Sequence, residues 1–382
     1  MKKKKKALIL CWVIIIVSVL LAAGIYFHAD EKIADALKDE EPVAEDVLEE
    51  EPTSEPVVTE EVEPEEVKKD TTIVITGDVE LSEYVQRNYN ASGATGVVSE
   101  EMLQELSSAD VLEINNEFCF SERGEQAPDK QFTFRVNPSY VSLLNEMGVD
   151  VAGLANNHVL DFGKDALSDT FTTLSDAGIE YTGAGTSRED ASKLIVKEVN
   201  GKKYGFLAAS RVIPVGSWNV DNSQPGVFTC YDTTALCNAI TAAKTQVDYL
   251  FVCVHWGVEH TTELTDYQVD NGHAYIDAGA DAVIGSHPHV LQGVEYYNGK
   301  PIFYSLGNFI FNENINSTMA VKFVFNEAGD VTVSLLPAYA SSAKTYLAEG
   351  EKAADILNYV NGLSSTVNVA EDGTLSDANN VP

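Results

Sequence analysis

Short apolar runs alternate with polar stretches along the chain from residue 71 onward. Five runs are rich in Val, Ile and Leu, and each ends in polar residues: "TIVITGD", "DVLEINNEF", "VDVAGLANNH", "YLFVCVHWG" and "DAVIGSHPH". Runs of this type are typical of strands that are buried on both faces of a sheet. Helix-like stretches at residues 164–177 and 232–245 lie between some of them. The pattern predicts an α/β fold.

Three later stretches predict β-hairpins. Residues 194–208 ("LIVKEVNGKKYGFLA") carry Asn-Gly at the expected turn, and residues 294–311 and 320–337 have the same character. Because hairpins add antiparallel strands, the sheets are predicted to be mixed. Residues 346–382 are expected to hold one amphipathic helix near 350–362, followed by a disordered polar tail.

The first 29 residues have the pattern of a membrane anchor. Five lysines at positions 2–6 precede an uncharged, mostly apolar run over residues 7–27, which as a helix could cross about 30 Å of hydrocarbon. The lysines predict a cytoplasmic N-terminus, a single pass through the cell membrane and an extracytoplasmic domain. A cleaved signal peptide is the alternative, because such peptides also begin with basic and then apolar residues.

Residues 30–70 are dense in Asp and Glu and contain no aromatic residue. This composition cannot bury enough apolar area to offset chain entropy, so we predict a disordered acidic linker before a folded domain at residues 71–345. The formal net charge of the whole chain is −34 at pH 7. A nucleic-acid partner is therefore not expected, because binding to phosphates needs a basic surface.

Polar side chains follow the predicted strands at equivalent positions. In open α/β sheets, ligands bind beyond the carboxyl ends of the strands. The residues there are Asp78, Asn115, Glu117, Asn156, Asn157, His158, His255, His287 and His289. Oxygen and imidazole donors suit manganese, iron or zinc, and a pair of such ions roughly 4 Å apart could activate water and clamp an oxyanion.

Each piece has a simpler explanation when it stands alone. His287 and His289 would point to the same side of an extended segment stiffened by Pro288, yet such a pair is often incidental. Asn156 and Asn157 suit a turn, Asp78 a cap, His255 a buried hydrogen bond and Glu117 an exposed carboxylate. Their joint occurrence at successive strand ends favours the metal site.

Several neighbouring residues are open to two interpretations. Asp161 could orient His158 or cap the helix that begins after Gly163. Trp256 and Tyr304 could line a pocket or belong to the core. Arg135 and Arg211 could contact an anionic substrate or form surface ion pairs, and Cys230 could pair with Cys237 in an oxidising environment.

The segments "ITGDVEL", "INNEF", "GLANNHVLDFG", "VHWGVE" and "GSHPHVLQG" resemble, in order and spacing, the CapA family, named for poly-γ-glutamate capsule biosynthesis. The resemblance covers about residues 71–312 and includes a similarity to calcineurin-like metallophosphoesterases. It implies two packed mixed β-sheets flanked by helices, with two divalent ions held by Asp78, Glu117, Asn157, His255, His287 and His289. It also implies a general acid or transition-state stabiliser at His158, beside which Asn157 and Asp161 are our further catalytic candidates.

Two positions depart from the family pattern. The first motif reads Gly-Asp-Val-Glu-Leu over residues 77–81 where a Met-like residue is usual, and Asn116 replaces a Leu. Two functions follow from the resemblance. The chain is either a metal-dependent hydrolase of a phosphoester or a cell-envelope polymer, or a non-catalytic component that binds poly-γ-glutamate beside a membrane-bound capsule synthase.

Overall fold

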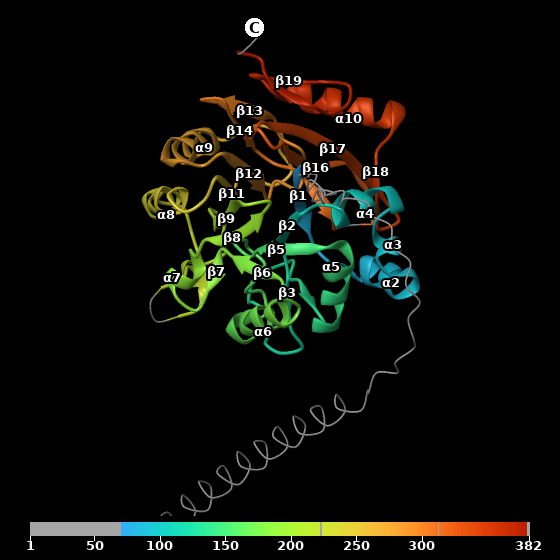
Figure 1. The fold of residues 1–382 in the computed structure, drawn as a ribbon. Coiled ribbons are helices and arrows are strands. Elements are labelled where there is room, and N and C mark those ends of the chain that lie inside the picture. The colour runs from blue at the N-terminus through green and yellow to red at the C-terminus, as the bar shows by residue number, and fades with distance from the viewer. Residues whose placement is uncertain (1–69, 222–223, 312, 380–382) are drawn as a thin grey trace, which may run out of the picture. The chain divides into compact units, whose positions relative to one another are not determined.

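Two mixed β-sheets form the centre of the fold in the computed structural model, which describes residues 70–221, 224–311 and 313–379 (Figure 1). The first sheet has the order β18-β17-β16-β1-β2-β5-β6 among the described residues, and β15 also pairs with β1. Its strands are β1 (Thr71–Val79), β2 (Val111–Asn116), β5 (Val149–Gly153), β6 (Glu180–Thr182), β15 (Asn308–Ile310), β16 (Ile315–Phe325), β17 (Val331–Ser341) and β18 (Lys344–Leu347). β1, β2, β5, β6 and β15 run parallel to one another.

The second sheet has the order β13-β14-β12-β11-β9-β8. Its strands are β8 (Ile195–Val199), β9 (Lys202–Ser210), β11 (Tyr249–His255), β12 (Ala282–Ser286), β13 (Val294–Tyr297) and β14 (Lys300–Phe303). β9, β11, β12 and β14 run parallel, and the two outer strands pair as hairpins. The predicted mixed sheets and all three predicted hairpins are therefore confirmed, the third as β16–β17.

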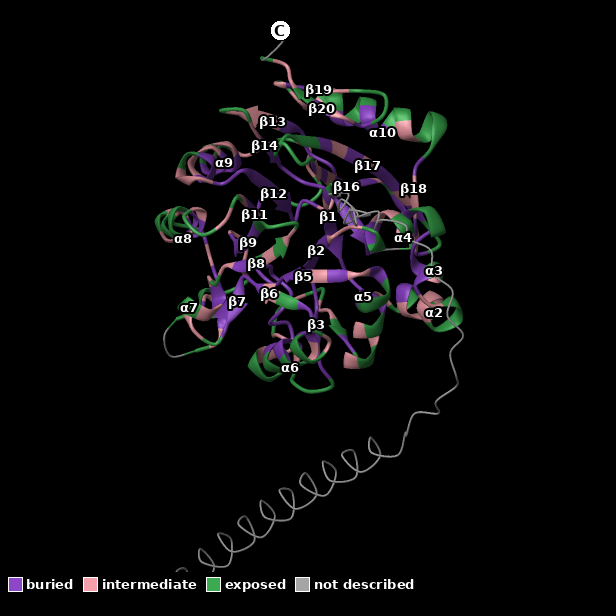
Figure 2. Ribbon diagram, viewed as in Figure 1, coloured by how far each residue is buried: buried purple, intermediate pink, exposed green. Residues whose placement is uncertain are grey.

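Alternating side chains bury both faces of each sheet (Figure 2). On β11, Phe251 faces the first sheet and packs against Phe323 with ring centroids 4.9 Å apart, while Leu250 and Val252 face the helices outside. On β1, Ile73 and Ile75 face the second sheet. Strands with two buried faces need apolar residues at nearly every position, which explains the continuous apolar runs in the sequence.

Helices cover the outer faces of the sheets (Figure 1). They are α2 (Glu83–Ser92), α3 (Ala94–Val97), α4 (Glu100–Ser107), α5 (Val141–Met147), α6 (Gly163–Asp176), α7 (Arg188–Ala191), α8 (Thr234–Lys244), α9 (Asp266–Ala278) and α10 (Gly350–Leu363), with 3₁₀ turns at Pro138–Tyr140 and Gly216–Trp218. α8 and α9 pack on the second sheet, and α4, α5 and α6 pack beside the first. The helices expected at 164–177, 232–245 and 350–362 correspond to α6, α8 and α10.

The expected membrane anchor is the main correction to the predicted fold class and location. No helix in the part of the chain that the structure describes is long and apolar enough to cross a membrane. The described helices reach at most 14 residues and bury one side against a sheet, whereas a span needs about 20 apolar residues. Residues 1–29 and nearly all of the 30–70 linker lie outside the described residues. We therefore withdraw the transmembrane helix and the single-pass membrane location from the account.

The tail after α10 also differs from the prediction. Residues 367–369 and 375–377 form a hairpin of β19 (Val367–Val369) and β20 (Leu375–Asp377) rather than a disordered tail. Val367 and Leu375 are buried in the core between the sheets and α10, and Leu335 on β17 donates its backbone N–H to Gly373. Two apolar residues spaced across a turn were too weak a signal to recognise in a polar segment.

Small strand pairs and the cysteines complete the picture. β3 (Cys119–Phe120) pairs with β4 (Arg135–Val136), and β7 (Ala184–Gly185) pairs with β10 (Gly226–Val227). The four cysteines among the described residues are free, so the disulfide considered between Cys230 and Cys237 is not formed.

Candidate metal centre

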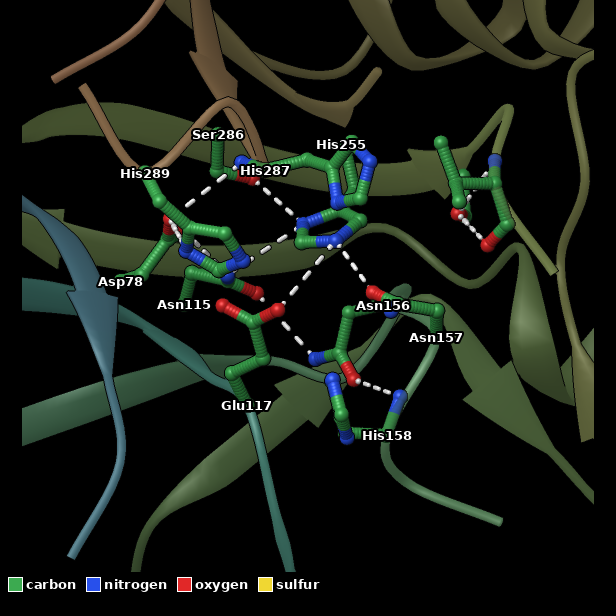
Figure 3. A network of polar contacts seen from close by, with 12 residues as sticks. Asp78, Asn115, Glu117, Asn156, Asn157, His158, His255, Ser286, His287 and His289 are labelled. Carbon is green, nitrogen blue, oxygen red and sulfur yellow. Dashed lines mark hydrogen bonds and ion pairs between the residues drawn. The ribbon is translucent and has the colours of Figure 1, made fainter. Parts of the chain in front are cut away.

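The carboxyl ends of parallel strands from both sheets meet at one cluster of polar side chains (Figure 3). Asp78 comes from β1, Asn115 and Glu117 from the end of β2, Asn156 and Asn157 from the segment after β5, His255 from β11, and His287 and His289 from the segment after β12. Hydrogen bonds link the two sheets here: His255 Nε2 lies 2.7 Å from Asn157 Oδ1, and His287 donates its backbone N–H to Asp78 Oδ2 over 3.3 Å. The structure thus brings together all the residues that the sequence predicted as metal ligands.

Two groups within this cluster have the spacing of metal-ligand sets. The possible ligand atoms of Asp78, Glu117 and His289 lie within 4.8 Å of one another, and so do those of Glu117, His255 and His287. Glu117 belongs to both groups. Glu117 would therefore contribute to holding an ion in either set, and two such sets side by side would suit a two-metal site.

Glu117 shows most directly that these residues fit a cation. Its side chain is fully buried, and neither carboxylate oxygen has a hydrogen-bond partner among the described residues, although His255 Nε2 lies 3.5 Å from one of them. Burial and the nearby Asp78 carboxylate raise the pKa of Glu117 well above its ordinary value. Leaving a buried carboxylate without donors is costly, so the site calls for a positive charge beside Glu117.

The histidines differ in charge because their surroundings differ. Burial lowers the pKa of His287 to about 3 and that of His255 well below its usual range. Both are therefore neutral at pH 7, which is the form that binds metals. Burial alone would lower the pKa of His289, but the carboxylates of Glu117 and Asp78 raise it to about 10. Without an ion His289 is therefore protonated and supplies positive charge to these two carboxylates, and binding a metal through its ring would release that proton.

Neighbouring polar groups orient the candidate ligands. Asn115 donates its side-chain N–H to Asp78 Oδ1 over 2.8 Å, and Asn156 donates to the Asn115 side-chain oxygen over 3.2 Å. His255 Nδ1 lies 2.9 Å from Ser286 Oγ, and His289 Nδ1 lies 2.7 Å from Asn308 Oδ1. Partners of this kind fix the ring orientation of metal-binding histidines. Ser286 and Asn308 were not singled out in the sequence, although Ser286 ends β12 and Asn308 begins β15, next to the cluster.

The backbone of the "HPH" segment corrects the predicted geometry. His287 and His289 have φ angles of 97° and 59°, so the segment is not the extended strand that the sequence suggested. The two rings still converge, with centroids 5.7 Å apart. Positive φ is uncommon for residues other than glycine, and the strain that it costs recurs at functional sites.

His158 lies at the edge of the cluster, where its backbone N–H donates to Asn156 Oδ1 over 3.0 Å (Figure 3). Its Nδ1 is 2.7 Å from Asp161 Oδ2, and its ring stacks on Phe134 with centroids 4.2 Å apart. Asp161 also accepts the backbone N–H of Phe134 over 2.7 Å, and α6 begins without a side-chain cap from Asp161. Asp161 therefore orients His158 rather than capping the helix. Burial lowers the pKa of His158.

Lys130 is a site residue that the sequence gave no means to find. Its ammonium contacts the Asn157 carbonyl and the Asp161 carboxylate, and lies 3.0 Å from His158 Nδ1. Lys130 and Phe134 belong to an irregular segment between β3 and β4, where no periodic pattern marks a residue as functional. They hold His158 from two sides.

The remaining candidates lie outside the cluster. Arg135 donates to the carbonyl oxygens of Arg123 and Gly124, and the Arg211 guanidinium lies over the Tyr267 ring at 4.1 Å. Among the residues that the structure describes between 70 and 379, neither forms the surface ion pair that the sequence suggested, although Arg211 donates its backbone N–H to the His255 carbonyl. Trp256 and Tyr304 are buried in the core, where Trp256 Nε1 donates to the Tyr304 carbonyl.

Comparisons with known proteins show the family to which the chain belongs. Residues 72–313 match the family model described as "Bacterial capsule synthesis protein PGA_cap", and the chain belongs to this family. The "PGA biosynthesis protein CapA" of Bacillus subtilis (strain 168) is 33% identical over 244 residues, which cover 63% of each chain. The "Capsule biosynthesis protein CapA" of Bacillus anthracis is 29% identical over 276 residues, which cover 70% of this chain and 66% of that one.

A "Probable polyglutamine synthesis accessory protein" of Mycobacterium tuberculosis is 33% identical over 215 residues, or 54% of this chain and 57% of the relative. The matched regions therefore span slightly less than two thirds of these relatives. The resemblance to the CapA family that the sequence motifs suggested is confirmed.

Proposed function

We propose that this chain is an accessory protein of poly-γ-glutamate capsule synthesis and acts as a metal-dependent hydrolase. The observation that carries the proposal is Glu117, a fully buried carboxylate without hydrogen-bond donors that belongs to two candidate ligand sets. The names of the relatives support the capsule assignment, and the donor set supports the chemistry.

The residues that would hold two divalent ions are Asp78, Glu117, Asn157, His255, His287 and His289. Carboxylate, amide and imidazole donors suit manganese, iron or zinc. When bound, such a pair lowers the pKa of water and stabilises negative charge on a substrate. Ser286 and Asn308 would keep the His255 and His289 rings in the orientation that presents their other nitrogen to an ion.

His158 is suited to act on the leaving group. Asp161 and Lys130 hold its Nδ1 side, and stacking on Phe134 fixes the plane of the ring, so Nε2 is the nitrogen left for a substrate. A positioned imidazole typically contributes about 10²–10⁴-fold to a rate by proton transfer. Asn157, the next residue, ties this network to the metal ligands through His255.

The proposed substrate is a phosphoester or a cell-envelope polymer such as poly-γ-glutamate, with a capsule polymer synthase as partner. The strongly acidic chain does not favour a long track for a polyanion. An anionic substrate would therefore be held locally, at the metal centre. This supports cleavage at one bond rather than extended binding of the polymer.

The test is a hydrolysis assay of the purified chain with a phosphodiester, a phosphomonoester and poly-γ-glutamate, with Mn²⁺, Fe²⁺ or Zn²⁺ added and then removed by a chelator. We expect turnover of one substrate that requires metal and that falls at least 10²-fold in Glu117→Gln. Glu327→Gln, an exposed carboxylate in the β16–β17 turn, is the matched control and should keep full activity. Metal-independent turnover, or none on all three substrates, would contradict the proposal, and the latter would favour a polymer-binding component.

A further inference from the structure

Glu259 lies in the segment between β11 and α9, four residues after His255. A carboxylate oxygen of Glu259 and ring nitrogens of His287 and His289 all lie within 4.8 Å of one another. Glu259 is exposed, whereas His287 is buried and His289 is largely so. Among the described residues, no hydrogen bond or ion pair holds the Glu259 carboxylate. No contact within the described part of the fold therefore accounts for the position of this carboxylate beside two imidazoles.

Backbone contacts hold this segment against the "HPH" segment. His260 donates its backbone N–H to the Pro288 carbonyl over 2.9 Å, and Gln292 donates its side-chain amide to the Thr261 carbonyl over 3.0 Å. Gly257, with φ of 90°, donates its N–H to the Tyr267 hydroxyl over 3.0 Å. His260 itself has φ of 60°. A segment tied on both sides of Glu259 keeps its carboxylate over the two histidines.

Three residues, Glu117, His287 and His289, each belong to two of the three groups of possible ligands. Glu117 is common to the two inner groups, His289 belongs to the group with Asp78, and His287 belongs to the group with His255. Glu259 therefore approaches one histidine of each inner group. Glu117 is on the buried side of the centre and Glu259 is on the exposed side.

We propose that Glu259 is a solvent-side ligand of the metal centre. This inference rests on the proposed metal-dependent function and adds a third carboxylate to Asp78 and Glu117. Because Glu259 is exposed and its carboxylate has no partner among the described residues, its side chain is free to change rotamer toward an ion. Because it is exposed, Glu259 is also the ligand that a substrate can replace without unfolding any buried contact.

The test measures metal binding itself. The full chain is titrated with Mn²⁺ or Zn²⁺ against a fluorescent chelator, as wild type, Glu259→Gln and Glu263→Gln. Glu263 is exposed on the same segment and is in none of the ligand groups, which makes it the matched control. We expect Glu259→Gln to lower the affinity for at least one of the bound ions by about tenfold or more. The affinities of the control should equal those of the wild type. Both variants should melt at the wild-type temperature, because neither side chain is buried.

A second readout is the visible absorption of the Co²⁺-loaded protein, which responds to the ligands around the ion. Glu259→Gln should change that spectrum and Glu263→Gln should not. Equal affinities and equal spectra in all three proteins would overturn the inference while leaving the proposed function intact. Absence of metal binding by the wild type would instead overturn both.

Discussion

The contacts around His289 hold its ring in one orientation within the candidate metal centre. Its Nδ1 lies 2.7 Å from Asn308 and 3.3 Å from Asp78, and its ring packs on Phe311 with centroids 5.1 Å apart. The motif that contains it was visible in the sequence as two histidines around a proline. Its positive φ was not, because backbone conformation at a non-glycine residue depends on contacts made by distant segments.

We predict that His289→Ala lowers the metal content of the purified protein by at least one equivalent while the protein stays folded. Removing the imidazole deletes a ligand, and alanine at positive φ should cost only about 1 kcal/mol of stability. Elemental analysis and thermal unfolding measure the two effects. His260→Asn, a nearby exposed histidine replaced by a residue that tolerates positive φ, is the control. Unchanged metal content in His289→Ala would remove His289 from the ligand set.

Lys130 contacts both His158 and Asp161. Lys130→Met should lower kcat by about 10-fold or more with little change in KM or metal content, because it disturbs His158 and Asp161 rather than the ligands. Steady-state kinetics with the substrate found active would show this split. Lys164→Met, an exposed lysine that contacts Gln224, serves as control. An effect on KM alone would mean that Lys130 binds substrate and does not position His158.

At the scale of elements, the strands were the most predictable part of the fold. Continuous apolar runs identified β1, β2, β5, β11 and β12, and the polar residues after them identified the site. The segment between β3 and β4 was not predictable, because Lys130 and Phe134 act through contacts with residues about 25 positions away. The β19–β20 hairpin was missed because its stability comes from packing on β17 and α10.

Glu113 on β2 is a polar residue inside an otherwise apolar strand. Burial between the sheets raises its pKa to about 8, and a hydrogen bond with Cys253 partly opposes the shift. Because the folded protein holds the proton more tightly than the unfolded chain, this contribution to stability is fully present below about pH 4.5 and is lost as the pH rises toward 8. The slope from this one group should be about 1.4 kcal/mol per pH unit in that range.

We therefore predict that Glu113→Gln becomes progressively more stable than the wild type between pH 5 and pH 8. Glutamine keeps the shape of the neutral acid but cannot ionise. Urea unfolding of both proteins at a series of pH values gives the difference directly. A difference that does not change with pH would show that Glu113 is not protonated in the fold.

The C-terminal hairpin supplies another prediction. Leu375 is 6% exposed and packs in the core shared by both sheets. Leu375→Ala should destabilise the domain by about 2–3 kcal/mol, the lower part of the range for buried leucines, because the hairpin lies at the edge and can relax. Chemical denaturation measures the loss. A negligible effect would mean that residues 364–379 are dispensable for the stability of the fold.

In the whole molecule, the two sheets meet at one candidate metal centre. Each sheet alone presents only part of the donor set, with Asp78, Glu117 and Asn157 on one and His255, His287 and His289 on the other. The formal net charge of −34 makes a bound cation favourable for the molecule as a whole. Family membership was predictable from the spacing of the motifs, whereas the membrane location drawn from the N-terminal pattern was not supported.

The measurement that tests the central claim most directly is the number of metal equivalents bound per chain, determined by elemental analysis of the purified wild type and Glu117→Gln after dialysis against Mn²⁺ or Zn²⁺. We predict close to two equivalents for the wild type and a clear loss in the variant, because Glu117 belongs to both ligand groups. A wild type that retains no metal, or a variant that binds as much as the wild type, would contradict a dinuclear centre built around Glu117.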